Sequence, residues 1–139
     1  MNSEIAWMNY QLRTRVAKGM LNANSAVAVV RRNAAQGLPL DFGWSPEEHS
    51  AAGEYITISP RTGIVTATFT DIDKGASKNL KLVPIGKGRL FIFSGSPIAG
   101  PELVTINWFC TSQESGNPFA LPENSFGSLP TRFAPANCR

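Results

Sequence analysis

The chain has 139 residues, of which 42% are hydrophobic and 17% are charged. This length and composition predict a single domain with a hydrophobic core, and they exclude a disordered chain or a coiled coil. The formal net charge of +3 permits attraction to DNA or to an anionic surface but does not require it. The sequence lacks the long apolar run of a transmembrane helix.

Residues 5–36 are predicted to form one long amphipathic helix. We interpret the preceding residues 1–4 as residues added for recombinant expression. Apolar or small residues recur every three or four positions as one stripe, namely Ile5, Met8, Leu12, Val16, Gly19, Ala23, Val27, Val30 and Ala34. Gly37 and Pro39 predict the end of the helix. A helix with a single apolar face needs a flat partner, and a β-sheet is the expected one. The side chains expected to pack are Ile5, Met8, Leu12, Val16, Val27 and Val30.

Residues 37–54 are predicted to form a connecting loop, because prolines and glycines interrupt any regular period there. The only histidine of the chain, His49, lies in this loop beside Glu47 and Glu48. A metal-binding or catalytic role is one interpretation of this histidine. A histidine on a surface loop is the other, and we favour it because no second cluster of metal ligands accompanies it.

Residues 55–110 are predicted to form an antiparallel sheet of about four strands. The sheet is predicted from apolar runs, several of them alternating, at residues 55–59, 64–70, 80–85, 89–93 and 103–110. Residues 71–79 are expected to be a polar connection, and residues 94–102 a loop rich in glycine and proline. One long helix followed by a meander of strands predicts an α+β fold with the helix on one face of the sheet.

The two cysteines of the chain lie at either end of an irregular stretch. Cys110 ends the last predicted strand, and Cys138 lies one residue before the C-terminus. A disulfide that ties the tail to the sheet is the economical interpretation, and two unrelated buried thiols are the alternative. Such a bond would contribute roughly 3 to 4 kcal/mol to stability in the chain-entropy model. It would also indicate an oxidising compartment and therefore an exported protein.

No constellation of residues predicts catalysis, and we expect neither an enzyme nor a cofactor or metal site. The Asp71-Ile72-Asp73 segment resembles the start of a calcium loop but lacks the remaining ligands. The Gly86-Lys87-Gly88 segment lacks the spacing and the following helix of a phosphate-binding loop. Both segments are interpreted as ordinary turns.

Basic residues concentrate around the second predicted hairpin and suggest a nucleic-acid surface. The candidate DNA-binding residues are Lys74, Lys78, Lys81, Lys87 and Arg89, together with Arg132 in the tail. Such a cluster can follow the phosphates of a nucleic acid. The alternative is a solvated sheet edge that lysines protect from pairing with other strands.

Three stretches are similar to a known family. The first is the helical pattern Trp7-x-x-Tyr10-x-x-Arg13-x-x-Val16-x-x-Gly19, and the second is TGIVTATF at residues 62–69. The third, and the most specific, pairs INWFC at residues 106–110 with LPTRFAPANCR at residues 129–139. In this order they resemble the type IV pilins, and specifically the type IVa class. Residues 86–102 and 111–137 are longer than is usual in that family.

The resemblance implies a pilin-type roll whose last strand is tied to the tail by Cys110–Cys138. It implies a structural subunit of a type IV pilus, which supports surface adhesion, twitching motility or DNA uptake. The alternative function is that of a minor pilin that captures DNA during natural transformation. The implied partners are other pilin subunits, the pilus assembly machinery, DNA or a host-surface receptor. The implied location is the cell surface, after a stage in the inner membrane through an apolar N-terminal segment that residues 5–36 would continue.

Overall fold

The structure is a computed structural model that describes residues 3–46 and 53–139. Helix α1 (Ser3–Gln36) is followed by strands β1 (Glu54–Ile58), β2 (Val65–Asp73), β3 (Ala76–Gly86), β4 (Arg89–Leu90) and β5 (Asn107–Thr111). The short helix α2 (Gly100–Leu103) precedes β5, and three 3-10 turns follow it, η2 (Glu123–Ser125), η3 (Thr131–Phe133) and η4 (Ala136–Cys138). The predicted α+β class, with one long N-terminal helix against an antiparallel sheet, is confirmed.

Helix α1 ends at the predicted residue and begins two residues before the predicted start. It has 34 residues, which correspond to a length of about 51 Å. Gly37 ends the helix with a φ of 70°, a left-handed conformation that glycine adopts without a steric penalty. The amide of Leu38 then donates to the carbonyl of Asn33 at 3.0 Å, so a carbonyl of the last turn is satisfied.

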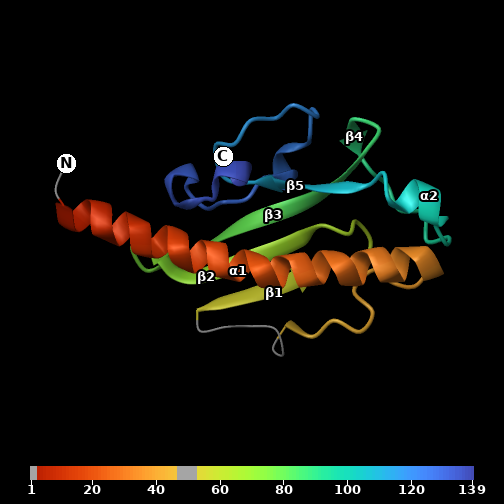
Figure 1. The fold of residues 1–139 in the computed structure, drawn as a ribbon, viewed down its shortest axis with the longest axis horizontal. Helices are drawn as coiled ribbons and strands as arrows, with labels where there is room; N and C mark the ends of the chain where they lie inside the picture. Colours follow the sequence, from red (N-terminus) through yellow and green to blue (C-terminus); the bar gives the residue numbers. More distant parts are fainter. Residues whose placement is uncertain (1–2, 47–52) are drawn as a thin grey trace.

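The apolar stripe of α1 packs on the sheet over most of its length, but Met8 does not. Val16, Gly19, Ala23, Val30 and Ala34 are buried, while Leu12 and Val27 are half-buried. Figure 1 shows the first turns of α1 extending past the strands, so no strand covers them. The expectation that Met8 packs is therefore wrong, since 58% of its surface is exposed. The side chain of Ile5, which was also expected to pack, lies outside the described side chains.

Gly19 is the point where α1 comes closest to the sheet. A Cβ atom built on Gly19 would overlap Glu54 Oε2 and would lie 2.6 Å from Cε1 of the fully buried Phe69. Glu54, the first residue of β1, is itself held under the helix, because Asn22 Nδ2 donates to its Oε1 at 2.7 Å. The absence of a side chain at residue 19 therefore sets the distance between the helix and the sheet.

Replacing Gly19 by alanine is expected to destabilise the fold by about 2 kcal/mol, because the added methyl group overpacks the interface. At an exposed helix position the same change would stabilise by about 1 kcal/mol. Urea unfolding measures the difference, with Ser25→Ala on the exposed side of α1 as a control expected to stay within about 0.5 kcal/mol. A stabilised Gly19→Ala variant would contradict this packing.

The described residues form a five-stranded antiparallel sheet in which β3 is the central strand. Strands β1, β2 and β3 lie in sequence order, and β5 pairs with the other edge of β3. Ile85 pairs with Leu90 of β4 and with Asn107 of β5, so these two strands flank the end of β3. The sheet was predicted to have about four strands, and β4, with two residues, is shorter than the predicted run at 89–93.

Two segments differ from the sequence prediction. The predicted polar connection at 71–79 is mostly strand, since β2 and β3 are joined by Lys74 and Gly75 alone. Both residues have positive φ, as in the type I′ turns that join twisted strands. The last strand was predicted from residue 103, but residues 100–103 form α2 and the strand begins at Asn107. Pro101 lies in the first turn of α2, where a missing N–H costs no hydrogen bond.

The sheet has a hydrophobic core on each of its faces. The main core lies between the sheet and α1 and includes Ile56, Phe69 and Leu80, all almost fully buried. A smaller core lies on the opposite face, where Val83 and Ile85 of β3 pack with Leu121. The residues that follow β5 therefore cover a second face that the sequence analysis did not predict.

Candidate functional site

The C-terminal tail is tied to the sheet by the predicted disulfide between Cys110 and Cys138. Both cysteines are buried, and each belongs to the main core. Their Cα atoms are 4.7 Å apart, although 28 positions separate them in the sequence. The alternative of two unrelated thiols is therefore wrong in this structure.

Hydrogen bonds fix the tail along an edge of the sheet before it reaches Cys138. The amide of Leu129 donates to the carbonyl of Asn79 at 2.8 Å, and the amide of Asn79 donates to Ser128 Oγ at 3.0 Å. Further along, Arg13 Nε of α1 donates to the carbonyl of Arg132 at 3.0 Å. The tail thus bridges strand β3 and helix α1. These contacts and the disulfide hold it in place although it has little regular secondary structure.

The candidate DNA-binding residues fall at two separate ends of β3. Lys74 is exposed in the turn before β3, and Lys87 and Arg89 are exposed at the turn after it. Strand β3 has 11 residues, which places these turns about 35 Å apart. Arg132 joins the Lys74 end, because its Nη2 lies 3.8 Å from Asp73 Oδ1. The structure therefore groups four of the cations as two pairs.

The remaining two lysines lie within β3 and on different faces of the sheet. Lys78 lies opposite Phe69, whose side chain is buried under α1, whereas Lys81 is three positions further along the strand. Because successive side chains of a strand alternate between its faces, these two side chains point to opposite faces. Lys81 Nζ donates to the carbonyl of Asn124 at 2.8 Å. The six cations thus form no single stripe, and DNA binding stays a prediction, which anisotropy of a labelled duplex across a salt series tests.

Helix α1 presents apolar side chains to solvent near its N-terminal end. Trp7, Met8 and Tyr10 are each exposed over more than half of their surface, and the rings of Trp7 and Tyr10 stack at 5.6 Å. Leu21, about three turns beyond Tyr10, is 68% exposed. At 3.6 residues per turn, Trp7, Tyr10 and Leu21 lie on the side of α1 opposite the buried stripe. The sequence analysis assigned Met8 to the stripe that packs on the sheet and used Trp7 and Tyr10 only for the family resemblance, so it did not predict that these side chains are exposed.

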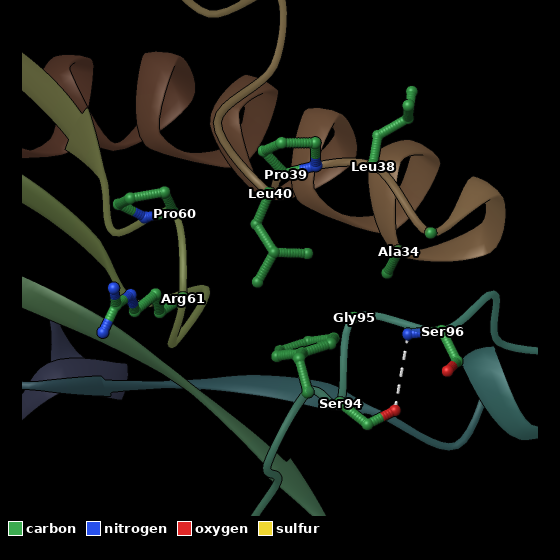
Figure 2. Close-up of a pocket in the computed structure, with 11 residues that line it drawn as sticks. Ala34, Leu38, Pro39, Leu40, Pro60, Arg61, Ser94, Gly95 and Ser96 are labelled. Atoms are coloured by element: carbon green, nitrogen blue, oxygen red, sulfur yellow. Dashed lines mark hydrogen bonds between the residues drawn. The ribbon is translucent and has the colours of Figure 1, made fainter.

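A groove lies at the other end of α1, between three loops that are distant in sequence (Figure 2). Its volume is about 540 Å³. Its walls come from the end of α1 with the following loop (Ala34, Leu38 and Leu40), from Arg61 in the β1–β2 turn, and from residues 93–96. No motif marks this groove in the sequence, because its lining residues come from three separate segments, each of which contributes between two and five residues, and the fold brings these segments together.

The sequence analysis also considered a role for His49, metal sites and membrane-spanning helices. His49, Glu47 and Glu48 lie outside them, so the structure leaves that part of the loop undescribed. Within residues 3–46 and 53–139, no three His, Cys, Asp or Glu side chains are grouped so that they could hold a metal ion. In the same ranges, no helix combines the length and the hydropathy that crossing a membrane requires.

Comparisons of the chain with protein-family models, with curated proteins and with solved structures found no match.

Proposed function

We propose that this chain is a structural subunit of a type IV pilus, a pilin of the type IVa class. The observation that carries the proposal is a set of three exposed apolar side chains, Trp7, Tyr10 and Leu21, on the side of α1 away from the sheet. A single-domain protein with one covered helix face would keep the opposite face polar. An exposed apolar face on the same helix marks a surface that packs against another protein.

The arrangement of the helix, sheet and tail also supports this proposal. Helix α1 rests on one face of the sheet, its first turns extend past the strands, and a disulfide ties the tail to β5. The resemblance to pilins implies this arrangement, in which the long helices of many subunits bundle along the filament. The side chains that face away from α1 on β1 and β2, such as Thr57, Thr66 and Thr68, are polar and suit the outer surface of a filament.

Replacing Tyr10 by aspartate is expected to abolish incorporation of the chain into surface fibres while leaving its own stability within about 0.5 kcal/mol of wild type. A charge on this face would be buried without a partner once helices pack on it. The wild-type chain and each variant are expressed in the source organism, and the surface fibres are sheared from the cells. The amount of the chain in the sheared fibres is measured by immunoblotting and intact mass. Urea unfolding of the purified variant measures the stability.

Tyr55→Asp provides a matched control, because it introduces the same change on the sheet face away from α1, where Tyr55 is 41% exposed. The proposal expects fibres that contain the wild-type chain and the Tyr55→Asp variant but lack Tyr10→Asp. Sheared fibres without the wild-type chain would overturn the pilus assignment itself. Fibres that accept both variants equally would overturn the role of the exposed helix face.

A further inference from the structure

We propose that the groove at the C-terminal end of α1 binds a small amphiphilic anion, with an alkyl chain or a single ring in the groove and a carboxylate at its rim. The volume of about 540 Å³ lies within the range of pockets that hold small molecules. The groove lies at the opposite end of α1 from Trp7 and Tyr10, so the proposed subunit contacts do not involve it.

Hydrogen bonds within the chain hold the walls of the groove together. The amide of Leu40 donates to the carbonyl of Pro60 at 3.3 Å, which joins the loop after α1 to the β1–β2 turn. The amide of Ile98 donates to the carbonyl of Ala34 at 3.0 Å and joins the third loop to the helix. The buried Asn33 adds a hydrogen bond from its Nδ2 to the carbonyl of Leu40 at 2.9 Å. A site whose walls are already ordered avoids much of the entropic cost of binding.

Close packing behind the apolar wall also restricts its movement. A Cβ atom on Gly63 would lie 2.7 Å from Cε2 of Phe93 and 3.3 Å from Cδ1 of Leu40, so Phe93 and Leu40 both pack against this glycine. Phe93 is supported from another direction by Phe91, whose ring centroid is 4.9 Å away. Figure 2 shows Leu40 and Ala34 pointing into the space above the segment from Ser94 to Ser96. The interior of the groove is thus a fixed apolar surface.

The charge at the rim selects the head group of the ligand. Among the described residues that line the groove, Arg61 is the only charged one, and none of them is acidic. Its side chain is exposed, and within the described part of the chain it forms no ion pair or hydrogen bond. In Figure 2 its guanidinium is turned away from Leu40 and Ala34, toward the outside of the groove. An apolar interior with one free cation at the rim is complementary to an apolar body that carries one negative charge.

The test is a titration of the isotope-labelled full chain with octanoate, followed by two-dimensional NMR. Shifts that saturate and concentrate on the backbone amides of residues 34–40, 60–63 and 93–96 are expected. Arg61→Gln should weaken octanoate binding about threefold, as for an exposed ion pair, while leaving the affinity for neutral octanol unchanged. Arg89→Gln removes the same charge from an exposed position outside the groove and should leave both affinities unchanged. Ser96→Phe, at an exposed position on the wall, should block both ligands without unfolding the chain.

Four results would overturn the proposal. The first is an absence of saturable shifts with octanoate, and the second is shifts centred on Trp7 and Tyr10 instead of the groove. The third is an octanoate affinity that Arg61→Gln and Arg89→Gln lower equally, since long-range attraction by net charge would then explain it. Concentration-dependent broadening of the groove resonances without any ligand would also count against it, because a second copy of the chain would then be the occupant.

Discussion

Replacing Cys110 and Cys138 together by alanine is expected to lower the free energy of unfolding by between about 3 and 4 kcal/mol. The disulfide closes a loop across 28 sequence positions, and cross-linking over this length removes that much entropy from the unfolded chain. Alanine is preferred to serine, because both sites are buried and a hydroxyl group there would lack a partner. A domain of this kind is stable by only about 5 to 15 kcal/mol, so the loss is a large fraction of the total. Urea unfolding with linear extrapolation measures it.

Reduction of the wild-type chain is the control for this prediction. The reduced protein and the double alanine variant should unfold at nearly the same urea concentration, and a reducing agent should not change the variant further. The tail should also become susceptible to limited proteolysis within residues 112–137, because only hydrogen bonds and packing then hold it. A loss below about 1 kcal/mol would instead mean that contacts such as that of Leu129 with Asn79 fix the tail by themselves.

Replacing Gly127 by alanine is expected to destabilise the protein by about 3 kcal/mol, at the upper end of the range for overpacking. Gly127 is buried beside Asn79 and Leu80 of β3 and beside Thr111, the last residue of β5. A Cβ atom there would overlap the carbonyl oxygen of Asn79 and would lie 2.8 Å from that of Thr111 and 2.9 Å from Leu80 Cα. All three atoms belong to the backbone, so no side chain can rotate away to make room. The strands or the tail would have to move, and the hydrogen bonds around Asn79 would weaken.

Gly116→Ala is the matched control, because Gly116 lies in the same tail and a Cβ atom there would meet no atom within 4 Å. Its free energy of unfolding should stay within about 0.5 kcal/mol of wild type or rise slightly, since alanine restricts the unfolded chain. Equal stabilities for the two variants in urea unfolding would show that the tail does not pack against β3 as described. Wild-type stability of Gly127→Ala together with an intact disulfide would lead to the same conclusion.

The sequence by itself determined the class of the fold and the position of its main elements. The helix could be predicted because local rules govern it, namely an apolar period near 3.6 and a glycine–proline stop after Gln36. The β1–β2 hairpin followed from alternation and from the turn at residues 60–63. The pairing of Cys110 with Cys138 was also predicted from the sequence, because the chain has only two cysteines. The structure confirms this disulfide.

Only the tertiary structure decided which surfaces are free and which loops meet. Met8 follows the apolar period of α1 but is exposed, because no strand extends beneath the first turns of the helix. Five of the six basic residues lie within residues 74–89, yet the length and the alternation of β3 separate them in space. The groove beside Arg61 combines loops that are distant along the chain. The period of apolar residues predicts which face of a helix or strand is buried. It does not predict how far the partner strand extends or which loops meet, because these depend on contacts between residues far apart in sequence.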